Sequence, residues 1–190
     1  MKKSEERLRG ILVSREIIVN KEENPYWRAY YSTGYGKSDD NKLILHPIEA
    51  LHLLDNKKII IVNENGENID RKKLINLMVG DKNAWPTYII YKDLRQRGYS
   101  IKLVNKYPIV IDIYPRGLSP IDSDPSYSVM SAEASKEINL GDLDTAIDIC
   151  KERKTQLVIG IVDELGDVTY YKVLEVLEVE TKLKIYQKKK

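Results

Sequence analysis

The chain has 190 residues, 42% of them hydrophobic, with 31 basic and 29 acidic side chains and a formal net charge of +2. It contains no apolar run as long as the roughly 20 residues that a membrane helix needs, and its N-terminus does not resemble a signal peptide. The single cysteine, Cys150, excludes an intrachain disulfide, so we expect a cytoplasmic protein. The nearly balanced charge neither requires nor excludes RNA as a partner.

The first 80 residues read as a small mixed α/β domain. Pro47 suits the first turn of a helix, and Asp70 suits an N-cap with Ile69 and Leu74 at the staple positions. Residues 20–41 are polar and predict an irregular segment. In chain order we expect two short strands within 8–19, a strand over 43–45, a helix over 48–56, a strand over 59–62 and a helix from 71 to near 80.

Residues 81–190 read as a second mixed α/β domain, joined to the first through residues 80–86. Gly98 stands where a left-handed C-cap would end a helix. Further along, Gly141-Asp142 is expected to cap a helix with Leu143, Ala146, Ile147 and Cys150 on one face. We expect helices over 87–97 and after 142, and strands over 99–104, 109–114, 126–132, 157–162 and 168–179.

An aromatic cluster lies in the polar segment 20–41, together with Arg28 and Lys37. It consists of Tyr26, Trp27, Tyr30, Tyr31 and Tyr35. Such a group can form a platform on which nucleic-acid bases stack. The alternative, which we favour, is a loop whose aromatic side chains cover a small core.

The chain has two histidines, His46 and His52, six residues apart on the same predicted helix. At that spacing they face different sides of the helix. We therefore predict a helix cap and a packing or surface residue, and no metal site.

The stretch YIIYKDLRQRGYSIKLVNKYPIVIDIYPRG, residues 88–117, resembles the C-terminal domain of archaeal tRNA-splicing endonucleases. In that family YxxLRxxGY opens the domain, and a tyrosine before Arg-Gly belongs to the active site. The run HPIEALHLLDNKKIIIV with the LINLM helix resembles the family's small N-terminal domain. The resemblance covers nearly the whole chain and implies two small mixed domains, the second with a central mixed sheet flanked by helices.

The resemblance also implies where catalytic residues would stand. The family cleaves RNA without metal or cofactor, using Tyr, His and Lys as base, acid and cation. The tyrosine corresponds to Tyr114, the histidine to Asp124 and the lysine to Thr155. An aspartate is ordinarily ionised at neutral pH and has no proton to donate to the leaving oxygen. The position of a base-holding arginine in the family is occupied by Asp148.

These departures predict a subunit that keeps the fold without the chemistry. We expect a structural subunit of a heteromeric tRNA-intron endonuclease, built as a dimer of heterodimers with a catalytic subunit and acting on intron-containing pre-tRNA. RNA contacts are expected at Arg116, Lys151, Arg153 and Lys154. The alternatives are an active endonuclease with Lys154 or Lys151 as the cation, and an RNA-binding or adaptor protein that reuses the fold.

Two features predict an interface with another subunit. Asp163, Glu164 and Asp167 lie on a short loop where three carboxylates repel one another, and the resemblance implies that this loop docks into a basic cleft of a neighbouring subunit. The expected strand 168–179 is apolar on both faces and is a candidate sheet edge. We expect Tyr171, Val173 and Leu177 at the contact. The alternatives are a solvated turn and a strand buried under the chain's own helix.

Overall fold

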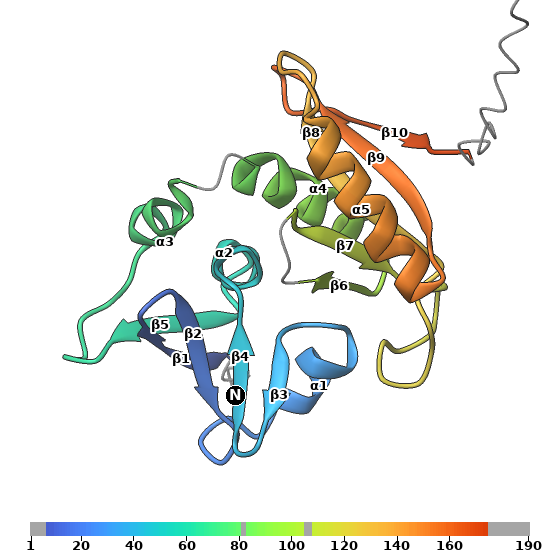
Figure 1. Ribbon diagram of the computed structural model, residues 1–190. Helices are drawn as coiled ribbons and strands as arrows, with labels where there is room; N and C mark the ends of the chain where they lie inside the picture. The colour runs from blue at the N-terminus through green and yellow to red at the C-terminus, as the bar shows by residue number, and fades with distance from the viewer. Residues whose placement is uncertain (1–6, 81–82, 105–107, 175–190) are drawn as a thin grey trace, which may run out of the picture.

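The computed structural model describes residues 7–80, 83–104 and 108–174, which form two mixed β-sheets and five helices (Figure 1). The mixed α/β class expected from the sequence is confirmed. The elements are β1 (Leu8–Val13), β2 (Glu16–Asn20), α1 (Trp27–Ser32), β3 (Lys37–Asp39), β4 (Lys42–Leu45), α2 (Pro47–Asp55), β5 (Ile59–Asn63), α3 (Arg71–Met78), α4 (Ala84–Gln96), β6 (Ile101–Val104), β7 (Val110–Ile113), β8 (Tyr127–Glu133), α5 (Leu140–Arg153), β9 (Gln156–Val162) and β10 (Val168–Lys172). In the described ranges, every helix is too short or too polar to cross a bilayer.

The first sheet has the strand order β3-β4-β2-β1-β5, with β1 and β5 parallel and the other pairs antiparallel. Along β2, Ile17 and Val19 are fully buried, while their neighbours are more exposed. This alternation turns one face of the sheet toward the core. Helix α2 is buried from Pro47 to Leu53, because it packs against this sheet, α3 and α4.

The second sheet has the order β10-β9-β8-β7-β6, and its one parallel pair is β8 with β9. Helix α5 crosses one face and α4 lies against the other (Figure 1). Alternate residues of β7 lie on opposite faces of the sheet. Val110 belongs to the apolar cluster under α5, and Ile111 belongs to the cluster that includes residues of α4. The parallel pair requires a crossover, which α5 provides.

One apolar core runs through both halves of the chain, residues 7–80 and 83–174. It includes Leu51 of α2 and Tyr91 of α4, both 0% exposed. Polar contacts join the same two helices: Tyr88 of α4 donates to the Asp55 carboxylate of α2. The two sheets therefore share α2 and α4 as a common middle layer (Figure 1).

Three local predictions were wrong. Helix α4 begins at Ala84 and not at residue 87, because Pro86 lies in the first turn, where its missing N–H is not needed. The segment 20–41 is not irregular throughout, since it holds α1 and β3. The N-cap of α5 is Asn139, whose side chain accepts from the N–H of Asp142, and not Gly141-Asp142.

The last described strand, β10, lies at the edge of the described sheet, as predicted, but ends at Lys172. One face packs on the chain's own core, where Tyr170 donates to Asp93 of α4 over 2.6 Å. On the other face Tyr171 is 55% exposed. The rest of the predicted strand, including Leu177, lies outside the described residues.

Candidate functional site

The three positions that correspond to the catalytic residues lie at neighbouring strand ends of the second sheet. Tyr114 follows β7, Asp124 lies in the loop before β8, and Thr155 lies between α5 and β9. β7, β8 and β9 are adjacent strands, and β7 runs antiparallel to the other two. The C-terminal end of β7 therefore lies beside the N-terminal ends of β8 and β9. Thr155 contacts Ser128 of β8, with 2.8 Å between the hydroxyl oxygens.

A buried network lies beside these positions. The Asp112 side chain is 0% exposed, and Ser128 donates to its Oδ1 over 2.6 Å. The Arg153 guanidinium, from the last turn of α5, forms an ion pair with Oδ2 of the same carboxylate. An acid in the apolar run VIDIY was the sequence signal for this network, but neither Asp112 nor Ser128 was predicted as a site residue.

Tyr114 is 4% exposed. Burial raises the pKa of its hydroxyl, and the negative charges of Asp112 and Asp124 raise it further, while Arg153 opposes them. A tyrosine hydroxyl is ordinarily protonated at neutral pH, and the raised pKa keeps it protonated in its buried site. The environment therefore favours a packing role for this tyrosine.

The four predicted RNA contacts have different surroundings. Arg153 is engaged by the buried Asp112. Lys151 is exposed and lies 4.0 Å from Asp148, and Lys154 is exposed at the left-handed C-cap of α5. Arg116 is exposed, with its guanidinium carbon 4.8 Å from the centre of the Tyr99 ring. The internal ion pair of Arg153 leaves less positive charge at the site for a phosphate.

Both histidines have structural roles in the N-terminal half, as predicted. His46 is the N-cap of α2 and accepts from the N–H of Ile48, while Glu49 completes the capping box. His52 is buried, with its Nδ1 2.9 Å from the Tyr35 hydroxyl. Burial, helped by the charge of Arg95, lowers the pKa of His52 to about 4.

The aromatic cluster divides between core and surface. Tyr35 is buried, and Trp27, Tyr30 and Tyr31 pack partly on the core. Tyr26 is 45% exposed. The core-covering interpretation is thus confirmed for Tyr35, while the rings of α1 keep part of their surface in solvent.

The predicted interface loop connects β9 and β10. The Asp163 carboxylate accepts from the N–H groups of Leu165 and Asp167, each over 2.9 Å. Although the three carboxylates were expected to repel one another, Asp163 gains two hydrogen bonds within the chain and closes the turn. Glu164 and Asp167 are exposed, and Leu165 between them is 89% exposed.

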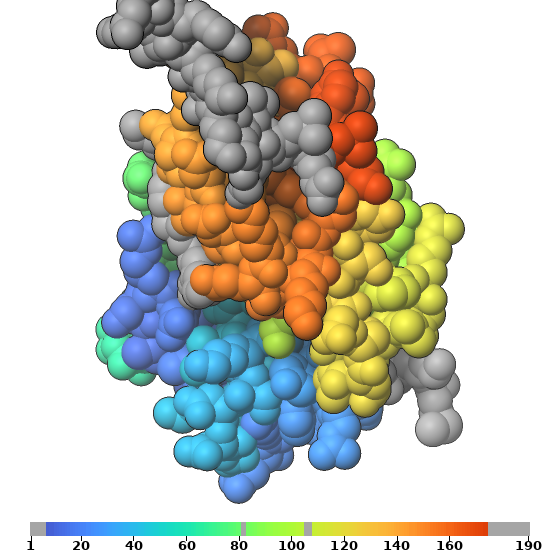
Figure 2. All heavy atoms as spheres, turned by 45° about the vertical axis from the view of Figure 1, so that its right-hand side comes forward, coloured from blue at the N-terminus to red at the C-terminus, as the bar shows by residue number. Residues whose placement is uncertain are grey.

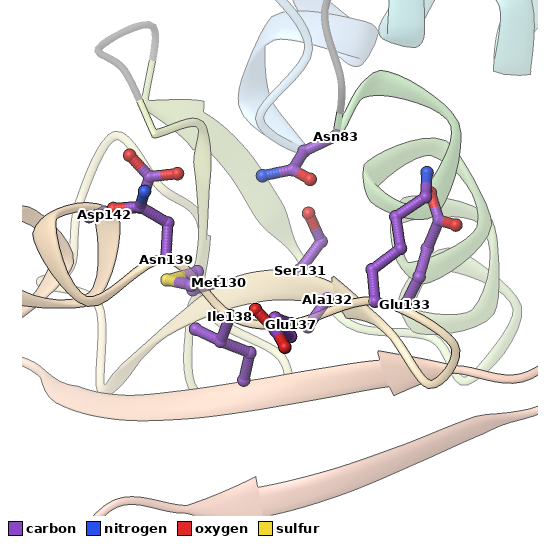
Figure 3. A pocket seen from close by; sticks show the side chains of 10 residues that line it. Asn83, Met130, Ser131, Ala132, Glu133, Glu137, Ile138, Asn139 and Asp142 are labelled. Atoms are coloured by element: carbon purple, nitrogen blue, oxygen red, sulfur yellow. Dashed lines mark hydrogen bonds and ion pairs between the residues drawn. The ribbon is translucent and has the colours of Figure 1, made fainter.

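A separate cavity of about 340 Å³ lies at the far end of β8, between the start of α4 and the start of α5. Asn83 and Ser131 point toward each other across it (Figure 3). Its acidic lining includes Glu133, which pairs with Lys136 at 2.7 Å. Within the described ranges, no group of three or more His, Cys, Asp or Glu residues could hold a metal ion.

Helix α4 is followed by Gly98 at φ +82° and by β6 and β7, which lead to Tyr114, in the order expected from the resemblance to RNA-splicing nucleases. Residues 8–75 match the model of the tRNA intron endonuclease N-terminal domain, and residues 84–170 match that of the catalytic C-terminal domain.

Curated relatives agree with these matches. The chain is 27% identical over 158 residues to a tRNA-splicing endonuclease of Methanothermobacter thermautotrophicus, covering 83% of this chain and 92% of the relative. It is 29% identical over 162 residues to that of Thermococcus gammatolerans (85% and 94%), and 31% identical over 139 residues to that of Methanococcus vannielii (72% and 77%). The chain belongs to the tRNA-intron endonuclease family.

Proposed function

We propose that this chain is a structural, non-catalytic subunit of a heteromeric tRNA-intron endonuclease, which cleaves pre-tRNA through a catalytic partner subunit. The observation that carries the proposal is the lack of a histidine in the second half of the sequence: the resemblance assigns the acid position to Asp124, and both histidines of the chain are built into the N-terminal half. The protonated, buried Tyr114 and the internal pairing of Arg153 add support.

We expect the isolated chain to cleave intron-containing pre-tRNA about 10²–10⁴ times more slowly than the assembled enzyme, because one positioned acid contributes that factor. The measurement is a single-turnover assay for products with 2′,3′-cyclic phosphate ends, on the chain alone and after co-expression with a catalytic subunit. Tyr114→Phe, which removes only the hydroxyl, should leave the rate of the complex within about twofold. Cleavage by the chain alone at the rate of the complex would refute the proposal and favour Lys154 or Lys151 as the cation.

The loop between β9 and β10 supports a partner contact. The hairpin tip presents two exposed carboxylates, Glu164 and Asp167, with the 89% exposed Leu165 between them, and the negative charge suits a basic cleft. Tyr171, on the exposed face of the adjoining edge strand, extends the same surface. Val173 is half-buried beside the α5 cluster and contributes less surface.

We expect Glu164→Lys/Asp167→Lys to weaken assembly with the catalytic subunit at least about tenfold at low salt, with a smaller effect at high salt, since screening weakens interactions between charges. Asp163 is kept because it closes the turn. The matched control is Glu64→Lys/Asp144→Lys, which makes the same charge change at exposed positions elsewhere. Sizing of the complex at two salt concentrations decides: equal behaviour of both variants would place the interface elsewhere.

A further inference from the structure

Partly exposed aromatic rings with cations over them lie near the junction between α1 and the second sheet. Trp27 and Tyr31 are neighbours on α1, with ring centres 5.9 Å apart. The distances from cation to ring centre are 4.6 Å for Lys21 and 5.6 Å for Arg28 on Trp27, 5.8 Å for Lys102 on Tyr31 and 4.8 Å for Arg116 on Tyr99. These rings and cations are called the aromatic strip.

The strip is held in place by contacts between the halves. Ser119 donates to the carbonyl of Ser32 over 2.7 Å, and Arg95 donates to the carbonyl of Thr33 over 2.6 Å. Gly34 follows at φ +94°, where a Cβ would lie 2.1 Å from the carbonyl oxygen of Ile101. In Figure 2 the yellow loop around residue 120 lies against blue residues of the N-terminal half. The strip is therefore a preorganised surface that adjoins the loop carrying Asp124.

Three cations of the strip, Arg28, Lys102 and Arg116, differ from several other arginines of this chain, which form ion pairs with carboxylates. Arg71, Arg97 and Arg153 each pair with a carboxylate. By contrast, no carboxylate of residues 7–80, 83–104 or 108–174 lies within 4 Å of the charged groups of Arg28, Lys102 or Arg116. Lys102 interacts with the buried Glu49 at longer range, but a cation without an ion pair keeps most of its charge available for a phosphate group.

We propose that the aromatic strip binds an unpaired RNA segment of the pre-tRNA, so that the N-terminal half contributes to substrate binding. Cations along the strip neutralise successive phosphates, and the partly exposed rings of Trp27 and Tyr31 stack with bases, as in other sites for single-stranded nucleic acid. The proposal rests on the proposed function for the identity of the ligand, which is pre-tRNA. It does not depend on whether the chain cleaves that RNA.

The test measures the affinity of the full chain for fluorescent pre-tRNA at several salt concentrations between about 50 and 200 mM. The slope of log K against log salt then reports the number of phosphate contacts. Arg28→Gln/Lys102→Gln/Arg116→Gln should weaken binding at least about tenfold and lower the slope of log K against log salt by about 2, since each lost contact with a phosphate of a single strand lowers it by about 0.7. The matched control is Lys58→Gln/Lys72→Gln/Lys73→Gln, at exposed positions near the start of β5 and on α3. Tyr31→Leu should weaken binding about fivefold or more with an unchanged slope, because it removes stacking alone.

Circular dichroism verifies that each variant is folded. The proposal is overturned if the wild-type chain shows no salt-dependent binding, if the triple variant binds like wild type, or if the control loses as much affinity. Loss of assembly with the catalytic subunit, with RNA affinity unchanged, would identify the strip as a protein interface and also overturn it. Cleavage by the isolated chain would refute the proposed function alone, because the binding comparison does not involve cleavage.

Discussion

Arg153→Ala is expected to lower the free energy of unfolding by about 3 kcal/mol, as the removal of one partner from a buried ion pair does. The Asp112 side chain is 0% exposed, and the Arg153 guanidinium is its cationic partner among the described residues. Without that guanidinium, the carboxylate keeps, among the described residues, the hydrogen bond from Ser128. Chemical denaturation of the wild type and the variant measures the difference.

Two further variants make this result specific. Lys151→Ala removes a cation from the same turn of α5, but its pair with Asp148 is 4.0 Å apart and about three-quarters exposed, so a loss below about 0.5 kcal/mol is expected. Asp112→Asn added to Arg153→Ala removes the unpaired charge and should recover part of the lost stability. An Arg153→Ala protein as stable as wild type would show that the ion pair is not needed in the fold.

Arg95→Ala is expected to cost about 3–4 kcal/mol, because hydrogen bonds from charged groups contribute about 1.5–3 kcal/mol each. Its guanidinium donates to the carbonyls of Thr33 and Ile101 over 2.6 and 3.1 Å, and to the Tyr91 hydroxyl over 2.8 Å. It also lies 3.9 Å from the centre of the Tyr35 ring. One side chain of α4 thus holds α1 against β6, and its loss removes all these contacts together.

Arg97→Ala is the matched control, two residues along the same helix. Arg97 is exposed and pairs with Asp93 at 2.7 Å in the i, i+4 arrangement, which contributes less than about 1 kcal/mol. Arg95→Lys should fall between the two, since an ammonium group cannot reproduce the planar fork. If denaturation midpoints of Arg95→Ala and Arg97→Ala agree, Arg95 does not hold the halves together.

The two proposals use different surfaces: the assembly contact lies on the second half, and the aromatic strip lies where the two halves meet. The positions that the resemblance assigns to catalysis lie at neighbouring strand ends of the second sheet, beside the network of Asp112, Ser128 and Arg153. The aromatic strip lies on the side where α1 meets β6. A subunit of this kind would contribute binding surface and assembly contacts to a complex whose chemistry is supplied elsewhere.

Much of this protein is determined by local sequence. Short apolar runs predicted β2 and β4, and apolar residues at helical spacing predicted α2 and α5, because helical spacing decides which face a side chain occupies. Asp70 was recognised as an N-cap, and its side chain accepts from the N–H of Lys73 over 2.8 Å. The absence of a histidine after His52 is a property of the sequence and excludes a histidine acid from the second half in any fold.

Other features were decided by tertiary structure alone. Helix α1 has six residues, too few for a periodic signal or for stability in isolation, so its docking on β6 determines it. Asp112 and Arg153 are 41 residues apart in the sequence. They meet because α5 crosses over the sheet and places β9 parallel to β8, and β8 in turn lies beside β7, which carries Asp112. Local patterns can mark Asp112 as an acid in an apolar strand, but its partner depends on strand order, which is set by the packing of the whole sheet.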